Sequence, residues 1–513
     1  MKYKGLYITL FVLTVMLLAL PAVQQQGKLF KFEPLHGVSE TVSRPELTVK
    51  SFVNGAYQTQ EDQYLSENIG FREPMIRYYN QLTWSLFRKT HNKTLFINDD
   101  NWIFNDYSVK QYYGQSVYDF ADSDEASVNK MNHDVNLLYQ FQTLMNEYGV
   151  SFFVCLAPEK GMVYAEQVPK MEFDRPTCVR AIDYYPPLFD SLSINYINFS
   201  DYFLQIKDTV SYPLYLKTSS HWSNLSATYM ADTLFHYMES ISGLNLHNPS
   251  YGQPYFAPTR VPDADLEYLL NLVFPFDSSE NQYVDVTLDN DSTAVTPIWL
   301  IVGDSYFWNW QYCLPLGQIF KTCHYWYYNN TIYNDSMHNH VSQADILREL
   351  LSTDIVTILY SPCNLYDLNL RFLSKALCSF YFEDDVIEAK LEELRRAIRN
   401  TPEWYASVER QASNKGLTIE EEIEINAEFT LYSAPWNYFE ELNEAKVPAC
   451  RNSRVKKVLS EIHDPVRDQY RYHIYNNPNW LNSIKEKAEA ANITFEEALE
   501  RDITWMIENS DQE

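Results

Sequence analysis

The sequence predicts an α/β domain whose mainly parallel sheet is covered by helices on both faces, followed by an all-α region at the C-terminus. Two observations lead to this fold class. First, apolar segments of strand length alternate with amphipathic helical segments up to about residue 381. Such alternation is typical of a parallel sheet with crossover helices. Second, the composition becomes charged and helical beyond residue 382, where an internal repeat begins.

Composition divides the 513 residues into four parts: 1–23, 24–50, 51–381 and 382–513. We interpret them in order as a membrane anchor or signal segment, a linker, the α/β domain and the helical region. The first part is an apolar run about as long as a bilayer core requires, after a lysine-containing start. Length and lysines favour an uncleaved anchor, and a cleaved signal is the alternative. Either way, we expect the rest of the chain to lie outside the cytoplasm.

The first elements after the linker are predicted to be helical. One helix carries large apolar residues at helical spacing, namely Met75, Tyr78, Tyr79, Leu82 and Leu86. A short strand is expected next, over residues 101–104.

Five apolar runs are predicted to form the sheet: residues 150–156, 194–199, 297–302, 320–328 and 355–360. Helices are predicted between them, over residues 128–149, 223–242 and 342–351. Because ligands of parallel sheets bind at the carboxyl ends of the strands, we look for chemistry there.

The helical region contains a repeat with an offset of 76 residues. The matching segments are Pro402-Glu-Trp404 with Pro478-Asn-Trp480, and Thr418-x-x-Glu421 with Thr494-x-x-Glu497. A proline in the first turn and a Thr-x-x-Glu cap predict two amphipathic helix pairs. We interpret them as a packing or protein–protein interaction module.

Charge and cysteine spacing make several classes of function improbable. With 40 Lys and Arg against 68 Asp and Glu, the net charge is −28, which repels phosphate backbones, so we expect no nucleic-acid partner. The seven cysteines show no CxxC or Cys/His spacing, and His338-x-His340 lacks a third ligand. We therefore assign no metal and no cofactor.

Gly303-Asp304-Ser305 directly follows the apolar strand 297–302. A sharp turn after a strand exposes a serine hydroxyl above a sheet and lets its own N–H help to hold an oxyanion. The alternative is a turn in which Asp304 and Ser305 merely cap the next helix.

His221-Trp222-Ser223 lies directly before the helix 223–242. Because a helix N-terminus disfavours a cation, we expect this imidazole to stay neutral and able to accept a proton. A structural histidine beside a helix cap is the alternative.

His-Trp-Ser followed about eighty residues later by Gly-Asp-Ser after a strand resembles the alginate O-acetyltransferase family. These are DHHW-like, SGNH hydrolase-like proteins of periplasmic polysaccharide acetylation. The resemblance spans roughly residues 45–380 and includes Asn54–Gln58, Glu67–Arg72, Asn101–Phe104 and Pro158-Glu-Lys160.

The resemblance implies an SGNH or flavodoxin-like core that transfers acetyl groups onto an exopolysaccharide or capsular polysaccharide. It also implies a membrane-bound O-acyltransferase as the partner that supplies the acyl groups. The protein would lie at the periplasmic side of the inner membrane, anchored by its N-terminal segment, or be secreted to the periplasm.

Carried over by position, Ser305 is the nucleophile and His221 the general base. The family has an aspartate two residues before the histidine, and this chain has Ser219 there. Loss of the orienting carboxylate from such a triad costs about 10⁴-fold in kcat. Either Ser219 or a distant carboxylate orients His221, or the site works as a slow dyad, or activity is lost.

Three further residues are weaker candidates for substrate binding. Lys160 is a candidate contact for an anionic sugar, with a surface lysine as the alternative. Asn364 and Tyr366 follow the last predicted strand, where a substrate cleft should open. The alternative functions are a carbohydrate esterase with the same site and a catalytically degenerate polysaccharide-binding or assembly protein.

Overall fold

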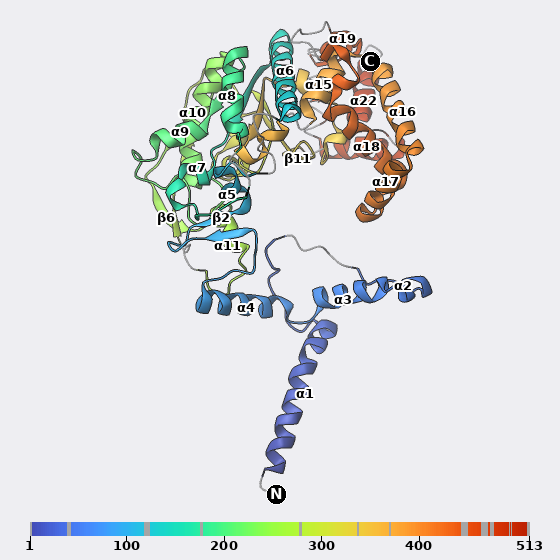
Figure 1. Ribbon diagram of the computed structural model, residues 1–513. Coiled ribbons are helices and arrows are strands. Elements are labelled where there is room, and N and C mark those ends of the chain that lie inside the picture. Colours follow the sequence, from blue (N-terminus) through green and yellow to red (C-terminus); the bar gives the residue numbers. More distant parts are fainter. Residues whose placement is uncertain are drawn as a thin grey trace.

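The computed structural model describes residues 3–37, 43–116, 124–174, 178–275, 280–335, 338–368, 371–442, 450–462, 470–471, 474, 477–491, 493 and 495–509. Within these residues the body is built around one six-stranded sheet, and a single long helix projects from it (Figure 1).

The sheet has the strand order β11-β10-β9-β12-β3-β4, and all neighbours are parallel except β11 with β10. The strands are β3 (Ser151–Leu156), β4 (Tyr196–Asn198), β9 (Ile298–Gly303), β10 (Thr322–Tyr327), β11 (Thr331–Tyr333) and β12 (Ile355–Tyr360). The predicted α/β class is confirmed, and all five predicted strands are present. The antiparallel edge strand β11 was not predicted, because three residues are too short for a periodic signal.

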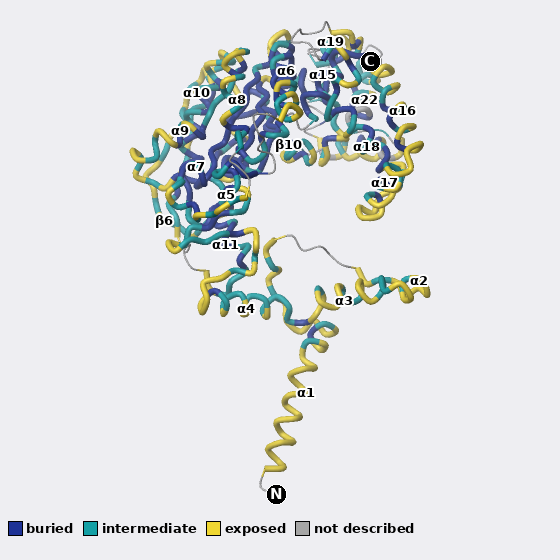
Figure 2. The backbone as a smooth tube through the Cα atoms, viewed as in Figure 1, coloured by how far each residue is buried: buried dark blue, intermediate teal, exposed yellow. Residues whose placement is uncertain are grey.

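Helices cover both faces of the sheet, as the sequence predicts. One face packs against α6 (Glu125–Glu147), α8 (Ala181–Leu192), α14 (Ile346–Leu351) and α15 (Phe372–Tyr381). The other face packs against α9 (Phe199–Ile206), α10 (Asn224–Ser242), α12 (Phe307–Cys313) and α13 (Leu316–Ile319). The three central strands β9, β12 and β3 are buried between these layers, as the dark central part of Figure 2 shows.

Smaller elements lie outside the six-stranded sheet. Three two-stranded sheets pair β1 (Leu95–Ile97) with β2 (Ile103–Asn105), β5 (Pro249–Tyr251) with β8 (Val286–Leu288), and β6 (Tyr255–Pro258) with β7 (Glu280–Tyr283). Short helices lie among them, namely α5 (Asp106–Tyr112), α7 (Lys160–Val163) and α11 (Asp265–Tyr268).

The C-terminal region is helical and contains the predicted helix pairs. Its helices are α16 (Asp384–Asn400), α17 (Pro402–Lys415), α18 (Ile419–Ser433), α19 (Arg454–Ile462), α21 (Pro478–Ala491) and α22 (Phe495–Asn509). The Thr418 and Glu421 capping box is present, whereas Thr494 and the Glu497 side chain lie outside the described part of the structure.

Equivalent positions of the two repeats are buried in separate cores. Val408 and Ile423 of the first pair belong to the large cluster that reaches the sheet. Ile484 and Leu499, at the same positions of the second pair, belong to a small cluster of their own. The first helix pair is thus continuous with the α/β core.

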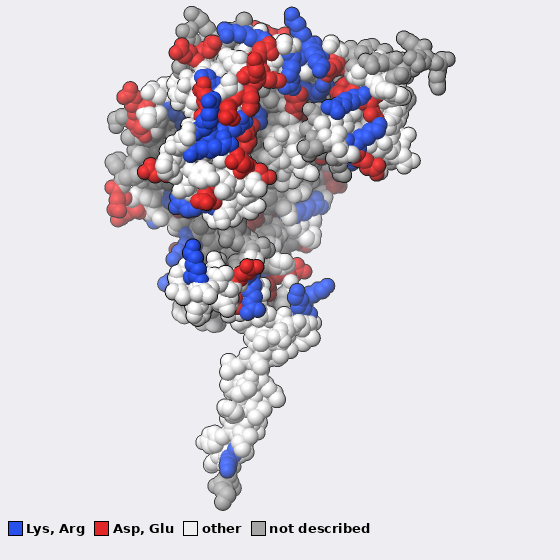
Figure 3. Space-filling view, turned by 90° about the vertical axis from the view of Figure 1, so that its right-hand side faces the viewer, with Lys and Arg blue, Asp and Glu red and all other residues white. Residues whose placement is uncertain are grey.

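The N-terminal part comprises α1 (Lys4–Gly27), α2 (Val49–Val53), α3 (Ala56–Asn68) and α4 (Arg72–Phe87). Helix α1 is the one described helix that is long and apolar enough to cross a membrane, with a mean hydropathy of 2.4 in its best window and none of that window buried. This property fits both a signal anchor and a signal peptide. In the space-filling view α1 is an almost uncharged rod below a body rich in charged side chains (Figure 3).

Candidate active site

Ser305 lies just beyond the end of β9, where Gly303 allows two strands to approach closely. A Cβ on Gly303 would lie 2.4 Å from the carbonyl oxygen of Leu359, its neighbour on β12. Only glycine therefore fits, and the turn that follows begins at the carboxyl edge of the sheet.

Asp304 fixes this turn to the segment after β12. It is fully buried, and its Oδ2 accepts hydrogen bonds from Ser361 N, Ser361 Oγ and Asn364 Nδ2, each 2.7 Å long. Its backbone carbonyl accepts from the Tyr325 hydroxyl at 2.5 Å. The Asp304 carboxylate therefore holds the turn that presents Ser305.

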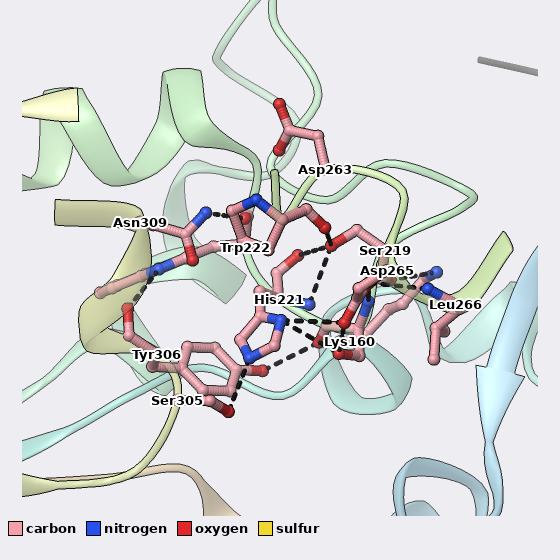
Figure 4. A network of polar contacts seen from close by, with 12 residues as sticks. Lys160, Ser219, His221, Trp222, Asp263, Asp265, Leu266, Ser305, Tyr306 and Asn309 are labelled. Carbon is pink, nitrogen blue, oxygen red and sulfur yellow. Dashed lines mark hydrogen bonds and ion pairs between the residues drawn. The ribbon is translucent and has the colours of Figure 1, made fainter. Parts of the chain in front are cut away.

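His221 and Ser305 face each other, as the sequence predicts. His221 Nε2 lies 2.8 Å from Ser305 Oγ, although the two residues are 84 positions apart (Figure 4). This is the separation that proton transfer between a hydroxyl and an imidazole requires.

Buried groups hold the two segments in this register. Trp222 Nε1 donates to the Tyr306 carbonyl at 3.3 Å, and the Tyr306 hydroxyl donates to the Ser220 carbonyl at 3.2 Å. Asn309 Nδ2 donates to the Trp222 carbonyl at 3.1 Å. Both neighbours of His221 are thus tied to the helix that follows Ser305.

Ser219 does not orient the His221 ring, contrary to one expectation from the sequence. Its side chain is fully buried, and its hydroxyl bonds to the backbone carbonyls of Pro262 and His221, both at 3.2 Å. The same oxygen accepts from the His221 N–H at 3.1 Å. Ser219 therefore shapes the backbone around the histidine and makes no contact with its imidazole.

The carboxylate behind the ring is Asp265, the first residue of α11. Its Oδ2 lies 3.1 Å from His221 Nδ1, and its Oδ1 accepts from the Ser220 N–H at 2.8 Å. The Ser220 hydroxyl also donates to Asp265 Oδ2 and lies 3.1 Å from Nδ1. Sequence analysis missed Asp265, because no motif marks it and it lies 44 positions beyond the histidine.

Hydrogen bonds join the segment that contains Asp265 to the segment that contains His221. Thr218 Oγ1 donates to the Asp263 carbonyl at 3.0 Å, and the Leu266 N–H donates to the Thr218 carbonyl at 3.1 Å. Asp263 Oδ1 accepts from the Asn224 N–H at 2.9 Å. These bonds hold Asp265 beside His221, although the two residues are far apart in the sequence.

The electrostatics fix the tautomer of His221. Burial alone would raise the pKa of Asp265, but the hydrogen bond and charge of His221 and the bonds from Ser220 outweigh burial and lower it. An ionised carboxylate only accepts hydrogen bonds, so Nδ1 carries the proton and Nε2 faces Ser305 with its lone pair.

The expectation that a helix N-terminus keeps the pKa of His221 low is wrong. Burial is the largest single influence and lowers that pKa, but the hydrogen bond and charge of Asp265 raise it. The nearby charges of Asp304 and Glu159 add to this, so the pKa of His221 lies above its ordinary value.

Lys160 is a structural residue and not a contact for an anionic sugar. It is 1% exposed, and its Nζ donates to the carbonyls of Ile103, Lys217 and Ser219 at 2.7, 2.9 and 2.7 Å. Burial lowers its pKa to about 7. All three donors of an ammonium are thus used inside the protein.

A cavity of about 300 Å³ opens above Ser305 and His221. Asn364 lines it, as predicted, together with Ser361 and Cys363 of its own segment and with residues of five other segments: Asn105, Tyr107, Glu159, Ser220, Tyr306 and Tyr328. Tyr366 lines a second cavity of about 390 Å³. The cavities share Tyr328, Cys363 and Asn364, so they adjoin.

The parallel sheet, the serine at the carboxyl end of β9 and the histidine opposite it define an SGNH hydrolase-like domain. Residues 97–294 match the family model described as "SGNH hydrolase-like domain, acetyltransferase AlgX". The resemblance to the polysaccharide O-acetyltransferase family inferred from the sequence is thereby confirmed, and the match supports acyl transfer. It contains His221 and Asp265 and ends before Ser305.

Several solved structures are similar to this chain at low sequence identity. The O-acetyltransferase domain of Pseudomonas putida AlgJ matches with a TM-score of 0.36 and 15% identity, over 53% of this chain and 92% of that one. Pseudomonas aeruginosa AlgX gives 0.35 and 13%, over 53% and 67%. Bacillus cereus PatB1 with a sulfonyl adduct gives 0.34 and 14%, over 53% and 99%. No curated protein matches the chain significantly.

Proposed function

We propose that this protein is an envelope acyltransferase that moves acetyl groups onto hydroxyls of an exopolysaccharide or capsular polysaccharide through Ser305, His221 and Asp265. The observation that carries the proposal is the continuous arrangement of hydroxyl, imidazole and carboxylate, with separations of 2.8 and 3.1 Å. A neutral serine is a weak nucleophile, and this arrangement supplies the base that activates it.

In the first half-reaction Ser305 Oγ attacks the acyl carbonyl of the donor while its proton passes to His221 Nε2. The tetrahedral intermediate collapses, the leaving group takes that proton, and the acyl group remains as an ester on Ser305. Asp265 stabilises the imidazolium that forms between the two steps. The Ser305 N–H, at the sharp turn after β9, is the group that we expect to donate to the oxyanion.

In the second half-reaction a sugar hydroxyl replaces the leaving group. His221 Nε2 accepts the proton of that hydroxyl while its oxygen attacks the acyl-serine. The acetyl ester forms on the sugar, and the proton returns to Ser305 Oγ. Water in place of the sugar would make the same site an esterase, which is the alternative function.

We assign the acceptor side of the cleft to Asn364 and Tyr366. Asn364 borders both cavities, and Tyr366 borders the second one with Lys130, Arg371 and Phe429. Aromatic rings among polar groups suit the apolar faces and hydroxyls of a pyranose. A polysaccharide would thus run from Ser305 into the second cavity, toward helix α18.

Helix α1 supports a place for this reaction at the outer face of the inner membrane. We propose that it remains as an anchor, so that a membrane-bound O-acyltransferase can deliver acyl groups to a site held close to the bilayer. Its length and its mean hydropathy of 2.4 fit a span.

Replacing Ser305 by alanine tests the proposal. We expect the variant to fold normally and to lose turnover of a chromogenic acetyl ester by about 10³-fold or more, because no other group can carry the acyl intermediate. Mass spectrometry of the wild type should find an acetyl adduct on the peptide that contains Ser305. Equal turnover by the variant would contradict the nucleophile assignment.

The choice between transferase and esterase rests on the acceptor. We expect an added oligosaccharide to raise the rate of ester turnover and to appear acetylated. Turnover that releases only acetate, whatever acceptor is supplied, would favour the esterase.

A further inference from the structure

Helix α4 is amphipathic with the wrong face outward for a helix packed on a soluble domain. The large apolar side chains whose spacing predicts this helix are on the surface. Met75, Tyr78, Tyr79, Leu82 and Leu86 are 46, 65, 57, 57 and 64% exposed. In a soluble domain such a stripe is normally turned to the core.

The opposite face of α4, with Asn80, Gln81 and the buried Trp84, is the one that contacts the body. Asn80 Nδ2 donates to the Leu270 carbonyl at 2.9 Å, and Gln81 Oε1 accepts from the Phe274 N–H at 2.9 Å. Arg77 donates to the carbonyls of Glu33 and Pro34 at 2.8 and 2.7 Å. These contacts hold the apolar stripe away from the protein.

The start of α4 is packed against the end of α1. A Cβ on Gly70 would lie 2.1 Å from the Pro21 carbonyl oxygen and 2.8 Å from Gln24 Cβ, so the turn before α4 touches the last turns of α1. The Phe71 ring lies 6.1 Å from Phe30, just after α1. Helix α4 then runs crosswise to α1 at its exit from the apolar span (Figure 1).

We propose that α4 lies in the headgroup region of the lipid bilayer that α1 spans, with its apolar stripe turned into the lipid. A helix of this kind binds a membrane surface by its buried apolar area. Tyr78 and Tyr79 suit the level of the headgroups, where amphipathic rings gather. Arg88, Lys89 and Lys93 follow the helix and suit anionic headgroups. The inference rests on retention of α1 as an anchor and not on the chemistry of Ser305.

A lipid bilayer is the occupant that these contacts favour over a second copy of the chain. The stripe begins where the apolar span ends, so lipid is already beside it whenever α1 is inserted.

Photocrosslinking in the full-length protein tests the inference. A diazirine amino acid replaces Leu82 in one protein and Ile425 in another, and each is reconstituted into vesicles of phosphatidylethanolamine and phosphatidylglycerol. Ile425 is a matched control because it is an exposed apolar residue on α18, with 45% exposure. We expect about tenfold more lipid adduct at position 82 than at position 425. Equal yields, or a protein–protein adduct at position 82, would overturn the proposal.

A second measurement shows whether the stripe holds the protein to the membrane. With a protease site inserted between Gly37 and Arg44, α1 is cut from the rest in intact vesicles. We expect the cut wild type to sediment with the vesicles and the variant with Leu82→Glu and Leu86→Glu to be released, about tenfold more into the supernatant. Equal retention of both would mean that protein contacts alone hold the body, which contradicts the inference. Ester turnover by the released variant should be unchanged, because the stripe lies outside the cleft.

Discussion

Asp265 lies behind the His221 imidazole. It supplies the carboxylate that the family pattern would place where this chain has Ser219. Its carboxylate accepts from Ser220 and faces His221 Nδ1, so it both fixes the ring and raises the pKa of the histidine. The Ser219 hydroxyl, in contrast, is hydrogen-bonded to backbone groups. The substitution in the family pattern is therefore offset by a carboxylate from another segment.

Replacing Asp265 by asparagine should impair the reaction in two ways. We expect kcat for an acetyl ester to fall by about 10³- to 10⁴-fold, because the amide cannot stabilise the imidazolium and permits the wrong tautomer. The base must be neutral to accept a proton, so wild-type activity is lost as the pH falls below the raised pKa of His221. Because the largest contribution that raises this pKa comes from Asp265, the acidic limb of the variant should lie at lower pH.

The measurement is kcat/KM against pH for both proteins, with Asp183→Asn as a control. Asp183 is a surface carboxylate on α8, bonded to Arg180. If kcat/KM of the Asp265 variant is neither lower than that of the wild type nor shifted in its pH dependence, another group orients His221.

At the scale of elements, the close approach of β9 and β12 is what presents Ser305. The Gly303→Ala variant should be less stable by about 1–3 kcal/mol, because its methyl group meets backbone atoms that cannot move without breaking the strand pairing. A Cβ there would lie 2.4 Å from Leu359 O and 2.9 Å from Leu359 Cβ. The midpoint of urea denaturation measures the loss.

Gly317→Ala is the matched control for that measurement. Gly317 lies in α13, where an added Cβ meets nothing within 4 Å, so we expect a change of no more than about 0.5 kcal/mol. A similar loss in both variants would show that crowding at β12 is not the cause.

The sheet strands were predictable because burial on both faces leaves uninterrupted apolar runs, as in residues 298–303 and 355–360. The long helices were predictable from apolar residues at helical spacing. Ser305 and His221 were each singled out by their positions at element ends, and their pairing followed from the resemblance to the alginate O-acetyltransferase family. Asp265 was not predictable, because it follows an irregular segment, and such a segment has no periodic pattern in the sequence. Helix α4 was predicted from the spacing of its apolar residues. Such spacing shows that a helix is amphipathic, but it does not show what the apolar face contacts.

On the scale of the whole molecule, the helical C-terminal region extends the wall of the cleft. Its first helix pair shares the large core with α6 and α15, so α18 is fixed relative to the sheet. Phe429 of α18 reaches the second cavity, and Arg371 lies over its ring at 4.8 Å. The region thus borders the path that we propose for the polysaccharide.

Replacing Phe429 by alanine should therefore affect the acceptor and not the acyl donor. The ring lines the second cavity, which Ser305 does not line. It is 54% exposed, so its removal should leave the core intact. We expect KM for an oligosaccharide acceptor to rise by about 3- to 10-fold, the loss of one ring contact, with turnover of a small acetyl ester unchanged. Ile425→Ala, one turn earlier on α18, is the matched control because Ile425 is exposed but does not line the cavity. Comparison of KM for acceptors of increasing length locates the effect: it should appear only when the chain is long enough to span both cavities. If the two variants behave alike with every acceptor, the helical region lies off the substrate path and serves only to pack against the sheet domain.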